Sequence, residues 1–484
     1  MQTRNLIDGQ WVGADDGATM PVFDPSDDAL VAEVPSCGRA EAARAVAAAA
    51  GAFASFQEIG EESRVALLHA ISDLMEERRG ALAELLTREQ GKPLAESMGE
   101  VDYARSYLTG AAFELERRAR ETRLDSALTG KNVLVRPAPL GVAAMITPWN
   151  FPYAMLTKKI GPAFAMGCPV VTKPSEETPL SALAFAEVCI DAGTPVGCLN
   201  VVTGDPVAIA SAFFESPDVR ILSFTGSTGT ARKLVEASSA QLPRLALELG
   251  GHAPFIVLED ADIDSAVDGL MISKFRNAGQ TCVSPNRIMV HRSLEDAFVA
   301  RLKERMSSLV PGRGLDPKTT LGPMINDDGV RKVQAHVADA LKHGARLVMG
   351  GDLIPLEGLA PRFHAPTILL DTTPEMLCFR EETFGPVCPI MAFDDVDDAI
   401  RVANSLPYGL ASYVWSSSSR NALSVAERLQ TGIVGLNDPA PVTSWTPFGG
   451  RKQSGWGIEG GGEALDEYAP PKTYSIVGLE DQHG

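Results

Sequence analysis

The sequence has few cysteines, and no two of them stand at the spacing of a metal or disulfide motif. Its 484 residues include seven cysteines, at scattered positions and without a Cys-x-x-Cys pair. This pattern excludes a disulfide-rich framework and a zinc site built from cysteine pairs. We expect no bound metal, and we expect all but one of these cysteines to be small buried hydrophobic residues.

Basic side chains are also in the minority. There are 43 lysines and arginines against 62 aspartates and glutamates, which gives a formal net charge of −19. A surface of this sign repels phosphate polymers and anionic lipid headgroups, so nucleic acid and membranes are poor candidate partners. No stretch resembles a membrane span, and the first residues lack the apolar core of a secretory signal. We expect a cytoplasmic protein.

Length and composition favour a globular protein of more than one domain. A chain of 484 residues exceeds one ordinary core, and 45% apolar with 22% charged residues is typical of folded proteins. Two alanine-rich stretches, 40–56 and 62–90, have helical periodicity, with glycines at 60 and 91 where the helices should end.

Short apolar segments alternate with helical ones from Gly141 onward. Strands are predicted at 142–146, 169–172, 199–202 and 220–224. Strands separated by helices of crossover length indicate a parallel, doubly wound sheet.

A second alternating region extends from about 253 to 437, with predicted strands at 254–258, 287–291 and 412–415. It indicates a second α/β unit. The β-like segments 132–136 and 472–477 lie outside both units, and unpaired strand edges of this kind invite another chain.

Cys282 is the candidate nucleophile. It ends the segment Phe275–Cys282, in which it follows small, amide and glycine residues. A partly exposed thiolate attacks a carbonyl carbon well when a base or an electropositive setting lowers its pKa.

Two further polar residues stand in apolar or rigid settings. Glu248 lies between two leucines and before a glycine pair, where desolvation would raise its pKa toward that of a general base; the alternative is a surface glutamate at a strand end. Asn150 lies between a tryptophan and two prolines, so its amide could form half of an oxyanion hole; otherwise it is a turn residue.

Three segments could bind a dinucleotide. Phe224–Gly229 follows a strand and opens a helix, so its amides could approach a diphosphate, although a tight structural turn fits as well. Lys173 and Glu176 could hold ribose hydroxyls at a strand end, with Glu176 disfavouring the 2′-phosphate of NADP; a solvated loop is the alternative. Glu382 and Phe384 offer a carboxylate for a ribose hydroxyl beside a flat ring.

Together these segments resemble the aldehyde dehydrogenase superfamily along essentially the whole chain. The motifs Pro-Trp-Asn-Phe-Pro, Lys-Pro-Ser-Glu, Phe-Thr-Gly-Ser, Leu-Glu-Leu-Gly-Gly, Gly-Gln-x-Cys, Glu-x-Phe-Gly-Pro and Pro-Phe-Gly-Gly-x-Lys-x-Ser-Gly occur in one order. The resemblance implies an α/β aldehyde dehydrogenase fold with a Rossmann-like parallel-sheet domain for the cofactor, an α/β catalytic domain and small β segments for oligomerisation. The implied ranges are 1–120 and 139–250 for NAD binding, 251–450 for catalysis, and 121–138 and 463–484 for assembly into a homodimer or homotetramer.

The resemblance also assigns roles. Cys282 is similar to the family's nucleophile, Glu248 to its base, and Asn150 with the Cys282 backbone amide to its oxyanion hole; Lys173 belongs to the same catalytic set. The implied cofactor is NAD, with NADP possible. Residues that match the family's cofactor contacts are Ile146, Thr147, Pro148, Trp149, Lys173, Ser175, Glu176, Gly204, Phe224, Thr225, Gly226, Ser227, Leu249, Glu382 and Phe384.

The chemistry implied by the resemblance is oxidation of an aldehyde to an acid. The Cys282 thiolate attacks the aldehyde, hydride leaves to the nicotinamide, and Glu248 activates the water that hydrolyses the thioester. The family's CoA-acylating members lack this glutamate as a group, so its presence favours hydrolysis. A cysteine acyl hydrolase without nicotinamide would leave Lys173, Glu176 and Glu382 unexplained, and a silent scaffold would not need Cys282 or Glu248.

Within the superfamily the chain is most similar to succinate-semialdehyde dehydrogenases. Arg276 matches an arginine that binds the substrate's distal carboxylate there. Lys158 replaces a second such arginine, and Val442 falls at about the position of a substrate-binding serine. Ser284 stands where many members have a second cysteine, so no disulfide switch is expected. The substrate is therefore expected to be a small anionic semialdehyde, with another hydroxylated or aromatic aldehyde as the alternative.

Overall fold

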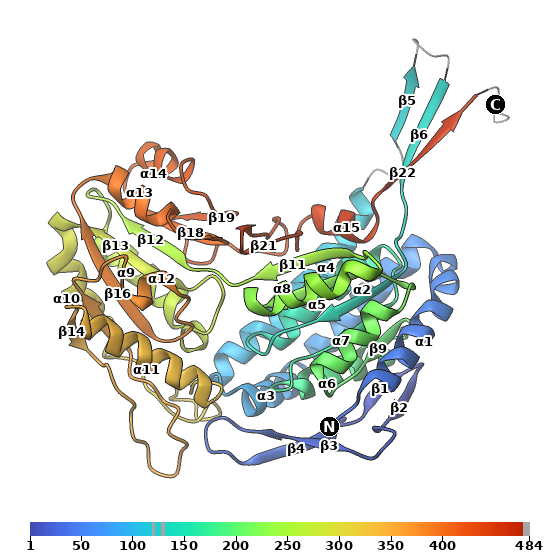
Figure 1. Ribbon diagram of the computed structural model, residues 1–484, viewed down its shortest axis with the longest axis horizontal. Helices are drawn as coiled ribbons and strands as arrows, with labels where there is room; N and C mark the ends of the chain where they lie inside the picture. The colour runs from blue at the N-terminus through green and yellow to red at the C-terminus, as the bar shows by residue number, and fades with distance from the viewer. Residues whose placement is uncertain (119–121, 127–130, 478–484) are drawn as a thin grey trace.

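Two α/β lobes form the body of the protein, and a small sheet projects from it (Figure 1). The computed structural model describes residues 1–118, 122–126 and 131–477, and for 123–126 the backbone alone. The seven residues 478–484 at the C-terminal end of the predicted assembly segment lie outside the described residues.

The first lobe is built on an eight-stranded sheet in the order β2-β1-β9-β8-β7-β10-β11-β21. The five strands from β9 to β11 are parallel, as the sequence predicts, but β1, β2 and β21 pair antiparallel at the edges. The predicted parallel sheet is confirmed for these central strands, and the antiparallel edge strands were not predicted. The bounds are β1 Asn5–Ile7, β2 Gln10–Val12, β7 Val142–Ile146, β8 Val170–Lys173, β9 Leu199–Val201, β10 Val219–Gly226, β11 Arg244–Leu249 and β21 Gly455–Trp456.

Helices cover both faces of this sheet and bury its apolar strands. One core lies under α2 to α6, and another lies between the sheet and α1, α7 and α8. This is the doubly wound arrangement. The helices are α1 Arg39–Glu58, α2 Gly60–Glu77, α3 Arg79–Gln90, α4 Leu94–Arg117, α5 Pro152–Ala165, α6 Pro179–Asp191, α7 Pro206–Glu215 and α8 Thr228–Ala237.

The prediction of one continuous helix at 62–90 is wrong. The backbone leaves helical geometry at Arg78, with φ −97° and ψ 9°, so two helices replace one. The predicted end at Gly91 is confirmed, because its φ of 89° supplies the left-handed cap of α3. Helix α4, which the sequence reading did not predict, then packs across α2, α3 and α5.

The second lobe contains a seven-stranded sheet in the order β14-β15-β16-β13-β12-β18-β19, parallel except for the edge strand β14. Helices α9 and α10 pack on one face, and α11 to α14 on the other. The strands are β12 Ala253–Val257, β13 Pro285–His291, β14 Arg346–Met349, β15 Thr367–Leu370, β16 Val387–Phe393, β18 Ala411–Trp415 and β19 Ile433–Leu436. The helices are α9 Ile263–Phe275, α10 Glu295–Met306, α11 Asp327–Lys342, α12 Leu377–Arg380, α13 Val396–Asn404 and α14 Ser419–Ala426.

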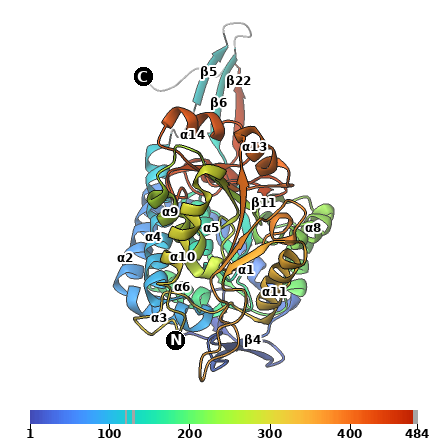
Figure 2. The same ribbon diagram turned by 90° about the vertical axis from the view of Figure 1, so that its left-hand side faces the viewer.

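The two β segments expected outside the lobes pair with each other. They form a three-stranded antiparallel sheet, β22-β6-β5, which stands clear of the body in both views (Figures 1 and 2). The expectation that both segments have unpaired edges is thus wrong for the edges at which β6 and β22 pair. The outer edges of the small sheet are those of β5 and β22. The bounds are β5 Thr122–Ser126, β6 Lys131–Pro137 and β22 Pro471–Ile476, with α15 Glu463–Tyr468 leading into β22.

Two small antiparallel pairs complete the architecture: the hairpin of β3 Thr19–Phe23 with β4 Leu30–Pro35, and the long-range pair of β17 Tyr408–Gly409 with β20 Arg451–Lys452. No helix in the described part of the chain has the length and apolarity needed to span a membrane. The domain boundaries 1–120 with 139–250, 251–450, and 121–138 with 463–484 stay a prediction.

Candidate active site

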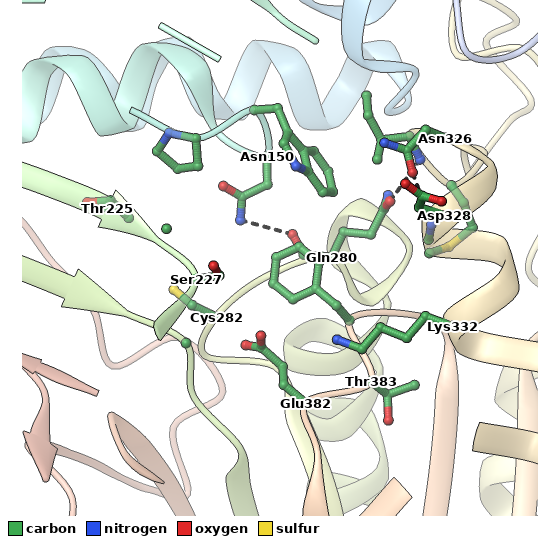
Figure 3. Close-up of a pocket in the computed structure, with 18 of the residues that line it drawn as sticks. Asn150, Thr225, Ser227, Gln280, Cys282, Asn326, Asp328, Lys332, Glu382 and Thr383 are labelled. Carbon is green, nitrogen blue, oxygen red and sulfur yellow. Dashed lines mark hydrogen bonds between the residues drawn. The ribbon is translucent and has the colours of Figure 1, made fainter. Parts of the chain in front are cut away.

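A cavity of about 320 Å³ lies between the two lobes, at the carboxyl ends of β7, β10 and β11. Both lobes supply its walls (Figure 3). Ligands of doubly wound proteins bind at this edge of the sheet. The sequence-predicted residues that line it are Pro148, Trp149, Asn150, Thr225, Gly226, Ser227, Leu249, Cys282, Glu382 and Phe384.

Cys282 lies in this cavity, just before β13. It is partly exposed, whereas the other six cysteines are buried, as predicted. Burial of the thiol raises its pKa to about 12, although the charge of Lys158 opposes this shift. Desolvation thus outweighs the charge of Lys158 in the chain without substrate or cofactor.

Asn150 faces Cys282 from the loop between β7 and α5 (Figure 3). It is 5% exposed, and its Nδ2 donates to the carbonyl of Gln280 at 3.1 Å. An amide nitrogen carries two hydrogens, so the second remains for a ligand oxygen in the cavity. The position suits an oxyanion donor better than a simple turn residue.

Glu248 lies at the end of β11, where Gly455 of β21 pairs with it. It is 3% exposed, and neither carboxylate oxygen has a hydrogen-bond partner among the described residues. Burial, followed by the charge of Glu459, raises the pKa of this carboxyl well above its usual value. The alternative of a surface glutamate is wrong, because the side chain is buried at the end of β11, next to the antiparallel strand β21.

A buried charge cluster that the sequence reading missed adjoins Glu248. Lys159 Nζ lies 2.6 Å from Glu459 Oε1, and Lys158 Nζ lies 3.9 Å from Glu459 Oε2. Lys159 also bonds Ser223 Oγ at 2.9 Å. The sequence does contain a signal for this cluster, because two adjacent lysines lie within the largely apolar helix α5. Buried lysines need a partner of opposite charge.

Lys158, predicted to contact substrate, is 2% exposed and enclosed by rings. Its Nζ lies 4.0 Å from the Phe448 ring centroid and 5.1 Å from that of Tyr107. Burial opposes its charge, but Tyr103 and Glu459 raise the net pKa of this lysine. Lys158 is thus a cation held by rings and a carboxylate beside the cavity.

The other two predicted substrate residues differ in exposure. Arg276 follows α9, is exposed, and places its guanidinium carbon 4.9 Å from the Phe151 ring centroid. No ion pair engages it among the described residues. Val442 packs against the same apolar core as Cys282.

The cofactor side of the cavity fits a dinucleotide. Strand β10 ends at Gly226, and Ser227 caps α8 by accepting from Thr230 N at 3.1 Å, so the first turn of α8 faces the cavity where a diphosphate can bind. Glu382 Oε1 accepts from Gly251 N at 3.1 Å, which leaves Oε2 for a ribose hydroxyl. Burial raises the pKa of Glu382 to about 7.

Several predicted cofactor contacts lie outside the cavity lining. Lys173 forms an ion pair with Glu176 at the end of β8, and the structure does not bring Lys173 to Cys282. Gly204 contacts the Cys37 backbone so closely that a Cβ would lie 2.1 Å from its carbonyl oxygen, which explains this glycine by packing. The others outside the lining are Ile146, Thr147, Ser175 and Phe224. The disfavouring of NADP by Glu176 stays a prediction.

The sequence did not predict part of the cavity lining. Most of these residues belong to a segment before and within the first turns of α11, which carries no motif. Asn326 caps α11, and an asparagine before a helical segment is a sequence signal for the start of that helix. The missed residues are Met155, Gly250, Gln280, Met324, Ile325, Asn326, Asp328, Gly329, Lys332 and Thr383.

A doubly wound lobe can bind a dinucleotide at the carboxyl ends of its strands, and the cysteine in the same cavity can form a covalent intermediate; together they suit an oxidoreductase with a cysteine nucleophile. The model of the aldehyde dehydrogenase family matches residues 11–474. The chain belongs to the aldehyde dehydrogenase family, whose members use NAD(P), and this overturns the alternative of a cysteine hydrolase without nicotinamide.

Relatives match along nearly the whole chain. A 3-sulfolactaldehyde dehydrogenase of Pseudomonas putida is 43% identical, over 99% of this chain and 98% of the relative. The NADP(+)-dependent succinate-semialdehyde dehydrogenase of Escherichia coli strain K12 is also 43% identical, over 98% and 97%. The crystal structure of a succinate-semialdehyde dehydrogenase from Burkholderia pseudomallei is 45% identical, covers 98% of this chain and 97% of that one, and has a TM-score of 0.96.

The raised pKa of Cys282 predicts how the enzyme without cofactor reacts with iodoacetamide. Because the thiolate is the reactive form, the alkylation rate should rise by about tenfold per pH unit from pH 7 to 10 without a plateau. The rate is measured by peptide mass spectrometry of residue 282, with Cys282→Ala as the background. A plateau at or below pH 10 would show that the thiol pKa is not raised.

Proposed function

We propose that this enzyme oxidises a small aldehyde carrying an anionic group to the corresponding acid, with Cys282 as the nucleophile. The observation that carries the proposal is the placement of Cys282 and the Asn150 amide in one cavity with the Ser227 helix start and the Glu382 carboxylate. Relatives of this chain are named for succinate semialdehyde and 3-sulfolactaldehyde, and both aldehydes carry an anionic group.

The residues divide the chemistry between them. Cys282 Sγ, after its proton has left to solvent, attacks the carbonyl carbon of the aldehyde as the thiolate, and Asn150 Nδ2 donates to the oxygen that becomes negative. The bound dinucleotide supplies the acceptor for the hydride that leaves this carbon. The acyl group then remains on Cys282 as a thioester.

Glu248 serves the hydrolytic half of the reaction. Its raised pKa makes its carboxylate a stronger base, which can take a proton from the water that attacks the thioester. Glu459 contributes to this shift by its charge, and Lys159 and Lys158 oppose it. Cys282 is released as the acid leaves.

Two substitutions separate these roles. Cys282→Ala should abolish reduction of the cofactor, because no covalent adduct can form. Glu248→Gln should allow one burst of reduced cofactor per active site and then stall at the thioester, with steady-state kcat lowered by at least about 100-fold. Stopped-flow absorbance of the reduced cofactor measures both, and loss of the burst in Glu248→Gln would contradict the assignment.

Arg276 is proposed as the anchor of the anionic group, because it is exposed, follows the helix that leads to Cys282, and has no ion pair in the described part of the chain. Arg276→Met should lower kcat/KM for succinate semialdehyde by about 10- to 100-fold, the value of one charged hydrogen-bond pair.

The matched measurement uses butanal, an uncharged aldehyde of the same chain length. Its kcat/KM should change by less than about threefold in Arg276→Met, because it has no group for the guanidinium. Equal losses for both aldehydes, or a wild-type enzyme that prefers butanal, would remove the anionic-substrate proposal.

We also propose assembly into a homodimer or homotetramer through the projecting sheet β22-β6-β5. The side chains of β22 are largely exposed in the single chain, and its outer edge is free to pair. Light scattering should give two or four times the chain mass of 51.4 kDa. A monomer at micromolar concentration would contradict this assembly.

A further inference from the structure

Three consecutive residues before the nucleophile have left-handed backbone. The φ angles are 52° at Asn277, 53° at Ala278 and 77° at Gly279. Glycine adopts this region freely, but asparagine rarely does so and alanine still less often. Strained backbone of this kind persists only where surrounding contacts hold it, and it gathers at functional sites.

Every polar atom of the Asn277 side chain forms a hydrogen bond. Its Nδ2 donates to the carbonyl of Asn150 at 3.1 Å and to that of Gln280 at 3.3 Å, while its Oδ1 accepts from Gln90 Nε2 at 2.8 Å. Its backbone N–H donates to Glu96 Oε2 at 2.6 Å. The residue is 2% exposed and does not line the cavity, so it does not touch the reacting groups.

The acceptors of Asn277 belong to the two loops that must meet for catalysis. The Asn150 carbonyl lies on the loop that carries the oxyanion donor, and it also accepts from Lys92 Nζ at 2.7 Å. The Gln280 carbonyl lies two residues before Cys282, and it accepts from Asn150 Nδ2 as well (Figure 3). One side-chain amide therefore links the backbone of the donor to the backbone of the nucleophile.

Gln90, which holds the Asn277 side chain, is itself buried and held by hydrogen bonds. Gln90 ends α3, and its Oε1 accepts from Lys92 N at 3.0 Å. Lys92 pairs with buried Glu100 at 2.5 Å, and Glu100 Oε1 accepts from Tyr153 N at 3.0 Å at the start of α5. A buried hydrogen-bonded network of this kind favours a single geometry.

We infer that Asn277 is a positioning residue that sets the spacing between the Asn150 amide and Cys282, so that the oxygen of the attacked aldehyde forms within reach of its donor. The inference rests on the proposed roles of Cys282 and Asn150. Loss of the link leaves the nucleophile in place but lets the two loops move apart, and a misplacement of about 1 Å can cost on the order of 100-fold in rate.

Ala278 provides a matched control. It has the same backbone conformation, is 3% exposed, and carries no polar group. Asn277→Gly and Ala278→Gly each relieve strain at a positive φ, but the first alone removes the linking amide. Both variants relieve a similar backbone strain, so a difference in their activity reports the loss of the linking amide.

The assay uses butanal and NAD with the full-length enzyme, since an uncharged aldehyde does not depend on the neighbouring Arg276. Asn277→Gly should lower kcat and the burst rate by about 10- to 100-fold with KM changed less than about threefold. Ala278→Gly should keep kcat within about threefold of wild type. Denaturant midpoints report whether each variant is folded.

Gln90→Met is the second variant, for the case in which Asn277→Gly does not fold. It leaves the amide of Asn277 in place but frees its Oδ1, so kcat should fall several-fold at unchanged KM. Wild-type kcat in the folded Asn277→Gly enzyme, or in Gln90→Met, or an equal loss in Ala278→Gly, would overturn the positioning role. Absence of cofactor reduction by the wild-type enzyme with every aldehyde would instead refute the proposed function.

Discussion

Desolvation at the junction of the two lobes is the constraint on which the rest of the site depends. Removing water raises the pKa of the Cys282 thiol and of the Glu248 carboxyl, so both groups resist ionisation in the chain alone. The same low dielectric strengthens every dipole aimed at charge that develops during reaction. The buried thiol and the Asn150 amide line one cavity, and the buried carboxyl of Glu248 lies outside its lining.

The cations beside the cavity offset part of this cost. Lys158 and Lys159 share the single carboxylate of Glu459, and Lys158 is further held by aromatic rings. Burial raises the pKa of the Cys282 thiol, the charge of Lys158 lowers it, and the charges of Glu382, Glu248 and Glu459 raise it further. The predicted contact of Lys158 with the substrate stays a prediction.

Local patterns predicted the central strands well. The predicted strand 142–146 coincides with β7, because a strand buried on both faces is an uninterrupted apolar run. The antiparallel edges could not be predicted in this way, since β21 pairs with β11 across about 200 residues of sequence. The break at Arg78 had only a weak signal in Gly80, because an isolated glycine is also tolerated within a continuous helix.

The candidate site was predictable where its residues lie within short motifs. Asn150 and Cys282 each stand in one such motif, and the structure places both in one cavity. Glu459 and Lys159 were missed because their pairing joins segments 300 positions apart. The linking role of Asn277 depends on contacts from α3 and from the Asn150 loop, which no local pattern reveals.

The central claim is that one sulfur atom carries the substrate during turnover. Quenching the enzyme with acid while it consumes succinate semialdehyde and NAD, followed by peptide mass spectrometry, measures this directly. The account predicts a succinyl adduct on the peptide that contains Cys282, and this adduct should be absent when the cofactor is omitted. An unmodified Cys282 in enzyme quenched during steady cofactor reduction, or an adduct on another residue, would contradict it.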